Sequence, residues 1–315
     1  MKPLPTPFAR RRLAIRWGTA LLLPLFLGGC SLQRVAIRAA GGALAAGGAT
    51  WGSDDDPELV REALPFALKT IEGLLAANPA DRRLLLAAAS GFTQYAQGFL
   101  VPEADYLEES DFARARAERE RAGRLLARAT GYGLRGLDTL RPGFAAALRN
   151  PGRRDAALAG LGPEAVPLLY WTGAAWGARA ALALDDPELA TDLPLVERLM
   201  RRARELAPGF EDGVIHDFYV VWEGARAGTA AGAADRAREA LAAARRYAGG
   251  RRAAPLVAFA ESVAVAEQDR ATFTRLLDEA LALDAAASGP HRVANLLAQR
   301  RARWLLARTD DLFLE

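Results

Sequence analysis

SDDDPELVREALPFALKTIEGLL, residues 53–75, has the pattern of an amphipathic helix together with a signal for its start. Three aspartates precede Pro57, which fits a side-chain cap followed by proline at the first helical position. Apolar residues then recur at intervals of three and four and form one stripe: Val60, Ala63, Leu64, Ala67, Ile71, Leu74 and Leu75. Because this period continues past Pro65, we predict a kink there, and an end of the helix at Asn78-Pro79.

The segment that follows predicts a partner helix. Its apolar residues fall on one helical face: Leu85, Ala88, Ala89, Phe92, Ala96 and Phe99. A second pair is predicted from Pro194, which opens a helix, through a turn at 207–209 to a helix that packs back on the first. The stripe of that returning helix consists of Val214, Ile215, Phe218, Val221, Trp222 and Ala225. A third pair runs from Phe273 through a turn at 288–290 to Trp304.

These pairs have lengths near the tetratricopeptide period of about 34 residues, without that repeat's full consensus. No stretch alternates with period two for long enough to indicate a strand. We therefore predict an all-α fold of stacked antiparallel helix pairs resembling tetratricopeptide repeats. The arrangement would be α-solenoid-like and form a single domain over residues 53–315.

One predicted helix, residues 166–184, is apolar on nearly every side, with Arg179 as its only charge. A helix of this kind belongs inside a fold. Gly173 and Gly177 lie four residues apart, on one face, where another element can approach closely. Tyr170, Trp171 and Trp176 add large rings with polar groups. Two interpretations stay open: a central core helix, or rings that line a cavity for an apolar ligand.

The N-terminus resembles a bacterial lipoprotein signal. Five basic residues, the last of them Arg16, precede an apolar stretch at 17–27 that is too short to span a bilayer. The sequence Leu27-Gly28-Gly29-Cys30 then places the single cysteine of the chain at the cut site. We predict a signal peptide at 1–29 and lipid attached to Cys30; the alternatives are an ordinary signal peptide or a transmembrane anchor.

Residues 30–52 are rich in alanine and glycine and predict a tether, although 35–49 could instead form a short helix on the membrane or on the body. Ser31, rather than an aspartate, follows Cys30, which favours the outer membrane over the inner. The predicted location is therefore the periplasmic side of the envelope.

Charge argues against a nucleic-acid partner. The whole chain has 41 basic and 38 acidic residues, a net charge of +3. Removing the five basic residues before Cys30 leaves 36 basic against 38 acidic residues, a net charge of −2. A mature protein of this charge offers no general attraction for phosphates.

No pattern indicates catalysis. The two histidines, His216 and His291, lie on separate predicted helices without a carboxylate or second histidine at ligand spacing. Metalloprotease, hydrolase, P-loop and dinucleotide motifs are missing from the sequence. Asp54, Asp55 and Asp56 lack the alternate spacing of a calcium loop, so helix capping is the better interpretation. We predict no enzyme, no cofactor and no metal.

Several segments, in order, resemble the T-component proteins of TRAP transporters. They are residues 53–75, 84–100 (LLLAAASGFTQYAQGFL), 170–176 (YWTGAAW), 210–216 (FEDGVIH) and 295–313 (NLLAQRRARWLLARTDDLF). The resemblance implies a periplasmic, tetratricopeptide-like lipoprotein that assists a tripartite, ion-driven transporter. It also implies association with the solute-binding subunit, trimeric assembly, and a cavity in each protomer for hydrophobic or amphipathic small molecules.

From these patterns we expect a lipid-anchored accessory subunit with a ligand cavity; the alternative is an envelope scaffold with a protein-binding surface and no small-molecule ligand. Ordinary core packing stays open for each residue expected to line the cavity or fix its walls. The candidates are Phe92, Tyr95, Tyr170, Trp171, Trp176, His216 and Asn295. Asn295 lies between apolar neighbours, so its amide must find hydrogen bonds if it is buried.

Overall fold

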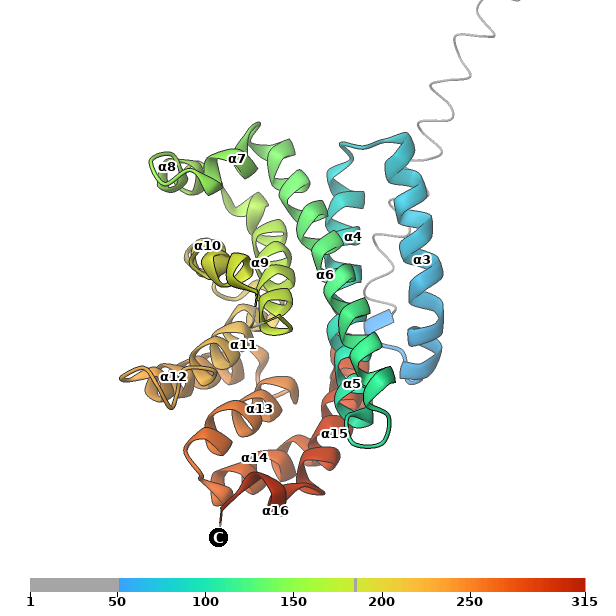
Figure 1. Ribbon diagram of the computed structural model, residues 1–315, viewed down its shortest axis with the longest axis vertical. Helices are drawn as coiled ribbons and strands as arrows, with labels where there is room; N and C mark the ends of the chain where they lie inside the picture. The colour runs from blue at the N-terminus through green and yellow to red at the C-terminus, as the bar shows by residue number, and fades with distance from the viewer. Residues whose placement is uncertain (1–50, 184–185, 315) are drawn as a thin grey trace, which may run out of the picture.

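The computed structural model describes residues 51–183 and 186–314, and within these ranges it is helical and contains no strand (Figure 1). The all-α prediction is confirmed. The predicted signal peptide, Cys30 and the tether up to residue 50 lie outside the described residues.

The N-terminal part of the domain begins as predicted. Helix α3 (Pro57–Ala77) starts with the Asp56 carboxylate accepting hydrogen bonds from the backbone N–H groups of Glu58 and Leu59. Pro65 lies inside α3 and does not end it. Of the predicted stripe, Ala63 is exposed, whereas Leu68, on the adjacent row of the helix, is buried. A helix hairpin therefore begins here, with its apolar face turned inward.

The partner of α3 is a longer run than predicted. Helix α4 (Arg82–Tyr95) continues through the π-helical turn η2 (Ala96–Leu100) into α5 (Val101–Leu107). This run, Arg82–Leu107, is long and apolar enough to cross a membrane, but 56% of its most apolar window is buried inside the protein, as in a core helix. Helix α6 (Phe112–Leu140) then returns and packs on α4 and α5.

A central apolar helix follows two short ones. Helices α7 (Phe144–Arg149) and α8 (Arg154–Ala159) and the turn η3 (Pro163–Ala165) lead into α9 (Val166–Ala181). Helix α9 packs on α4 and α6 on one side and on α10 (Pro187–Leu206) on the other. At Gly173 an added Cβ would lie 2.7 Å from Met200 Sδ of α10, so the glycine allows this close approach.

The start of α10 corrects one prediction. Pro194 does not open this helix but lies inside it. The start is Pro187, with the Asp186 carboxylate accepting a hydrogen bond from the Leu189 N–H. The four residues Asp-Pro-Glu-Leu at 186–189 repeat those at 56–59, so the same capping chemistry starts both helices.

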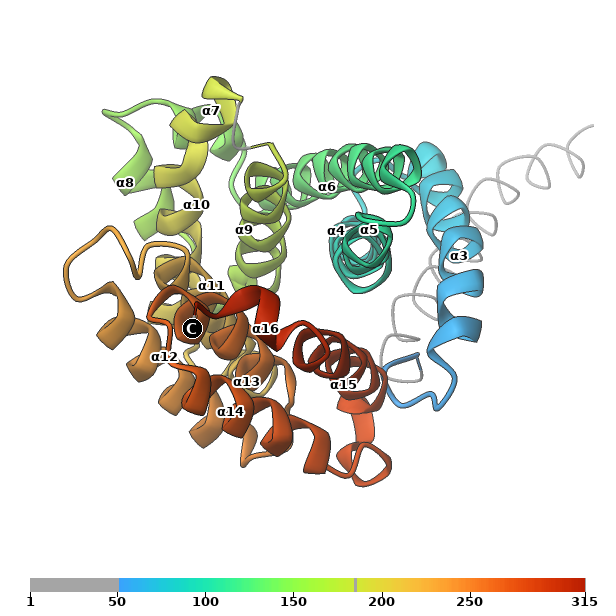
Figure 2. The same cartoon turned by 60° about the horizontal axis from the view of Figure 1, so that its bottom comes forward.

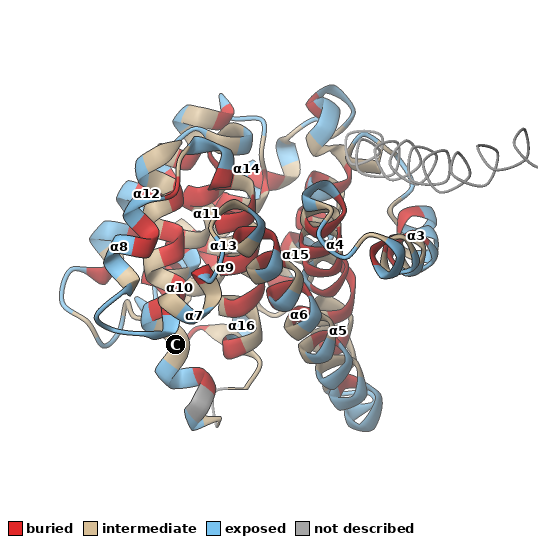
Figure 3. Cartoon of the chain, turned by 90° about the horizontal axis from the view of Figure 1, so that it is seen from above, coloured by how far each residue is buried: buried red, intermediate tan, exposed pale blue. Residues whose placement is uncertain are grey.

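The C-terminal helices complete the domain. They are α11 (Phe210–Gly224), α12 (Ala233–Ala248), α13 (Ala254–Phe259), the π-helical turn η4 (Ala260–Ala264), α14 (Arg270–Ala282), the 3-10 segment η5 (Ala286–His291), α15 (Arg292–Leu306) and α16 (Thr309–Leu312). Figure 2 shows α3–α6 on one side of the molecule and α7–α14 on the other, with α15 between them. Exposed residues lie on the outer faces of the helices and buried residues on the faces turned inward (Figure 3).

Candidate functional site

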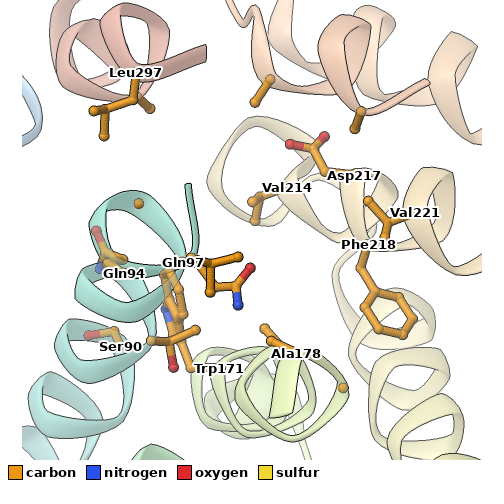
Figure 4. A pocket seen from close by; sticks show the side chains of 18 of the residues that line it. Ser90, Gln94, Gln97, Trp171, Ala178, Val214, Asp217, Phe218, Val221 and Leu297 are labelled. Carbon is orange, nitrogen blue, oxygen red and sulfur yellow. The ribbon is translucent and has the colours of Figure 1, made fainter. Parts of the chain in front are cut away.

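A cavity of about 2260 Å³ lies between the two sides of the molecule. Its lining comes from α3, α4, η2, α5, α9, α10, α11, α13, η4, η5 and α15, so elements from both ends of the described chain form it together. Apolar side chains face much of the space: Val60, Leu64, Ile71, Leu86, Ala174, Ala178, Val214, Phe218, Val221, Trp222 and Leu297. Part of this lining is seen in Figure 4.

Helix α11 forms an apolar wall of the cavity, although its apolar face was predicted to pack on the preceding helix. The stripe predicted to pack back on the preceding helix instead lines the cavity at five of its six positions: Val214, Phe218, Val221, Trp222 and Ala225. The reason is that α11 packs mainly on α12 and only slightly on α10, so this face has no helix against it. Val221 is accordingly 51% exposed although it is a large apolar residue.

A row of polar side chains faces the cavity from α4 and η2. Ser90, Gln94 and Gln97 are spaced by four and three residues and therefore share one helical face. In Figure 4 they lie across the space from Val214 and Asp217. Both glutamine side chains are exposed and make no hydrogen bond to any part of the chain that the structure describes.

On the opposite wall, Glu211, Asp217 and Arg252 form a charged group that we call the acidic pole. Arg252 pairs with Asp217 through both guanidinium nitrogens, with Nη1 at 3.3 Å from Oδ1. The same Nη1 donates to the Asp212 carbonyl oxygen at 3.5 Å. The Trp171 side chain lies beside the Glu211 carboxylate and acts to lower its pKa. The pole therefore has two carboxylates and one guanidinium.

Enclosure changes the acidity of both carboxyl groups. Burial raises the pKa of Asp217 to about 6, and the nearby Arg252 limits the rise. Burial also raises the pKa of Glu211, an effect that Arg252 and the Trp171 side chain oppose. Glu211 lines the cavity and stays accessible to solvent, so its carboxylate is only partly shielded from water.

A left-handed turn presents Glu211 to the cavity. Glu211, Asp212 and Gly213 have φ values of 44°, 55° and 82°, which side-chain-bearing residues adopt at a cost of roughly 1–2 kcal/mol each. An added Cβ at Gly213 would lie 2.6 Å from the Tyr247 Cβ, so only glycine fits there. The Asp212 carboxylate is held by His291 Nε2 at 2.7 Å.

Two of the seven predicted residues line the cavity, and five lie behind its wall. Tyr170 and Trp171 face the space, with their ring centroids 4.9 Å apart. Phe92 stacks on Tyr132, and Tyr95 packs against Phe99 in the N-terminal core.

The other three support the wall. Trp176 is 2% exposed and lies under Arg149. His216 Nε2 is 3.0 Å from the Pro208 carbonyl oxygen and its ring stacks on Tyr247, which braces the left-handed turn. Asn295 is buried and satisfied: Oδ1 accepts from the Ala253 N–H at 2.9 Å, and Nδ2 donates to the Arg251 carbonyl oxygen at 2.8 Å and to Ser288 Oγ at 2.9 Å.

Sequence reasoning missed the polar half of the site. Gln94 and Gln97 lie on the polar face of an amphipathic helix, which ordinarily faces bulk water. Asp217 interrupts the apolar run of α11, and an acid in such a position is a signal that could have been noticed. Within residues 51–183 and 186–314, no group of three or more His, Cys, Asp or Glu side chains could hold a metal ion.

A family model for the TRAP transporter T-component matches residues 53–313. The chain belongs to the TRAP transporter T-component family. It is also 30% identical over 264 residues to a protein of Treponema pallidum (strain Nichols) that is described only as uncharacterized. The alignment covers 83% of this chain and 82% of that protein. Family membership associates the protein with a TRAP transporter and with the cell envelope.

In this family member, one side of the cavity is closed by what we call the apolar seam, the contact of α9 with α4 and α6. Two glycines of α6 allow it. An added Cβ at Gly133 would lie 2.0 Å from Thr172 Oγ1, and one at Gly136 would lie 2.4 Å from Leu168 Cδ2. Leu168 is 1% exposed, so this contact is dry and closely packed.

The opposite side is closed by what we call the ionic seam, where arginines of α15 and the residues after it meet acids near α3 and α5. Its four pairs are Asp55–Arg292, Glu58–Arg300, Asp105–Arg301 and Glu109–Arg308. Arg301 is the most buried of these arginines; it also pairs with Glu261, and its guanidinium lies 4.3 Å from the Trp304 ring centroid. Charged contacts therefore complete the wall of this T-component's cavity.

Proposed function

We propose that the protein is a lipid-anchored accessory subunit of a TRAP transporter, which binds the solute-binding subunit and holds a hydrophobic or amphipathic small molecule in its cavity. Lipid at Cys30 would anchor it on the periplasmic side of the outer membrane. It performs no catalytic step and requires neither cofactor nor metal. A homotrimer is the expected assembly.

The observation that carries the ligand part of this proposal is the cavity itself. Its volume of about 2260 Å³ exceeds the roughly 300–1000 Å³ that is typical of small-molecule sites. Apolar walls with a few polar groups at defined positions are the usual composition of such sites. Tyr170 and Trp171, two of the residues predicted for this role, contribute to the wall.

The anchor part rests on the arrangement of the N-terminus. The single cysteine follows an apolar stretch and two glycines, and about twenty residues separate it from the first described residue, Trp51. A tether of this length would keep the helical domain close to the membrane and raise its local concentration beside a membrane-associated partner. Cys30→Ser should release the protein from membranes; continued partition with membranes and continued acylation would reject the anchor.

The main experiment purifies the intact lipoprotein and identifies co-purified proteins and extracted small molecules by mass spectrometry. A solute-binding subunit and an apolar or amphipathic molecule are the expected companions. Ala178 faces the cavity from α9, so Ala178→Trp should obstruct the space beside the α11 wall and displace a small molecule bound there. Ala117→Trp, at an exposed position of α6, is the matched control and should retain it. Envelope-assembly proteins without any small molecule would favour the scaffold alternative.

A further inference from the structure

We propose that the acidic pole binds the positively charged head of an amphipathic ligand, an ammonium or amidinium group, while the apolar part of the ligand lies along α11 and α9. The inference rests on the proposed function, because it assumes that the cavity holds a ligand. It adds the chemical class of that ligand and the residues that orient it.

The acidic pole has more negative than positive charge. Arg252 is already engaged: its two terminal nitrogens bond Asp217, and one of them also reaches the Asp212 carbonyl oxygen. The Asp212 carboxylate is separately paired with His291 and with Arg251. Within the described residues the Glu211 carboxylate forms no ion pair, and the pole of two carboxylates and one guanidinium carries one negative charge in excess.

The Glu211 carboxylate has few hydrogen-bond donors around it. Among the described residues, Trp171 is the one side-chain donor that acts on this carboxylate, although an ionised carboxylate can accept several hydrogen bonds. A carboxylate that is partly shielded from water and has so few partners is unfavourable, as the raised pKa of Glu211 reflects. A cationic ligand would supply both the missing charge and the missing donors. The Trp171 and Tyr170 rings beside it would add a cation–π contribution.

The wall that faces the acidic pole carries two glutamine amides. Gln94 and Gln97 point into the space opposite Asp217 (Figure 4), and neither amide bonds any described residue. Each amide oxygen is free to accept from an ammonium N–H, of which a primary amine has three. The segment that carries them leads into the π-helical turn η2, and turns of this kind recur at functional sites.

An apolar surface of α11 and α9 lies beside the acidic pole. Val214, Phe218 and Val221 are spaced by four and three residues on one face of α11, beside Asp217, and all face the cavity. Ala178 of α9 borders the same space. A ligand with its head at the pole would place its apolar part against this surface, whose exposure is otherwise unexplained.

Of the arginines in the lining, Arg83 offers the alternative site for a charged ligand. Arg83, at the start of α4, lines the cavity and forms no ion pair within the described residues. It precedes Gln97 by fourteen residues, about 21 Å along a helix, so it cannot neutralise the pole. An anionic ligand would bind near Arg83 instead.

The test compares three probes that share one apolar part: 4-phenylbutylamine, 4-phenylbutyrate and 4-phenylbutanol. Binding is measured by calorimetry on the intact lipoprotein in nanodiscs, with empty nanodiscs subtracted. We expect the amine to bind at least about tenfold more tightly than the acid or the alcohol, the range of one charge-assisted hydrogen bond. Glu211→Gln, which keeps the shape of the side chain, should remove about tenfold of the amine affinity. Glu239→Gln, on the exposed face of α12, should leave it unchanged.

Each other result has a defined meaning. Tighter binding of the acid, equal binding of amine and alcohol, no binding of any probe, or an unchanged Glu211→Gln variant would overturn the inference. If the acid or the alcohol binds and Ala178→Trp abolishes that binding, the cavity function stands and only the head group is wrong. If Ala178→Trp leaves every bound molecule in place, the ligand does not lie along α9 and α11, and the ligand part of the proposed function fails for this region of the cavity.

Discussion

The apolar seam and the ionic seam join the same two sides of the molecule by different chemistry. In the apolar seam, Gly133 and Gly136 bring α6 against Thr172 and Leu168 of α9 with no room for a methyl group. In the ionic seam, long arginine side chains reach across to carboxylates, and both members of most pairs are partly exposed. Packing fixes distances to within a few tenths of an ångström, whereas flexible ion pairs tolerate larger changes.

The two kinds of contact contribute unequally to the stability of the fold. Burial of apolar side chains contributes roughly 1.5–3 kcal/mol for each large residue. Exposed ion pairs contribute about 0–1 kcal/mol each and weaken as salt is added. The exposed pairs of the ionic seam therefore add little to stability, and the stronger contacts on that side are the more buried Arg301 pairs and the Tyr106–Trp304 ring contact.

The largest effect is expected from Leu168→Ala in the apolar seam. The substitution leaves a hole beside Gly136, and the loss of transfer free energy together with the hole should lower the free energy of unfolding by about 2–5 kcal/mol. Urea unfolding monitored by circular dichroism measures this change. Leu59→Ala, at a 55% exposed position of α3, is the control. Equal losses for the two variants would show that the seam does not carry the stability assigned to it.

A smaller effect is expected from Gly133→Ala, compared with Gly131→Ala on the same helix. At Gly133 the new methyl group would overlap Thr172, and overpacking of this kind costs about 1–3 kcal/mol. At Gly131 nothing lies within 4 Å, so the same change should stabilise α6 by roughly 0.5–1 kcal/mol. Thermal unfolding should therefore move in opposite directions for the two variants. A shift in the same direction would contradict the close approach of α6 and α9.

The smallest effect is expected from Arg300→Ala in the ionic seam. Arg300 and Glu58 are 2.6 Å apart, and their side chains are 46% and 48% exposed. Their coupling in a double-mutant cycle with Glu58→Ala should be about 0.2–1 kcal/mol at low salt. It should fall towards zero in 1 M NaCl, where screening acts over about 3 Å. A coupling above about 2 kcal/mol, or one insensitive to salt, would remove the distinction between the seams.

Much of the fold could be predicted because local chemistry decides it. The cap at Asp56, the period of three and four, and the small residues of the central helix each act over a few residues. The predicted start of α10 was wrong because Pro194 was interpreted as a residue of the first helical turn. The Asp-Pro sequence at 186–187, which repeats that at 56–57, is the stronger signal for a helix start.

The site was less predictable because tertiary contacts create it. Nothing local makes Glu211 and Asp212 left-handed; His216, His291 and the fit of Gly213 on Tyr247 hold them there. Nor does the sequence show that the polar face of α4 meets an internal space instead of bulk water. The aromatic residues predicted for the cavity were found by size, and size alone does not separate the lining residues Tyr170 and Trp171 from core residues such as Trp176.

The π-helical turn η2 has a consequence for changes in chain length. The N–H of Val101 bonds the carbonyl oxygen of Ala96, five residues earlier, so this turn holds one residue more than an α-helical turn. The additional residue is absorbed locally, and α5 continues in line with α4. Losing one residue from η2 would leave a regular helix whose flanking faces keep their directions. Losing one residue from the regular first half of α6, such as Gly123, would instead rotate Gly133 and Gly136 by about 100° away from α9. Thermal unfolding of the two deletions would separate these cases, and it would locate where the family can vary in length without losing its cavity.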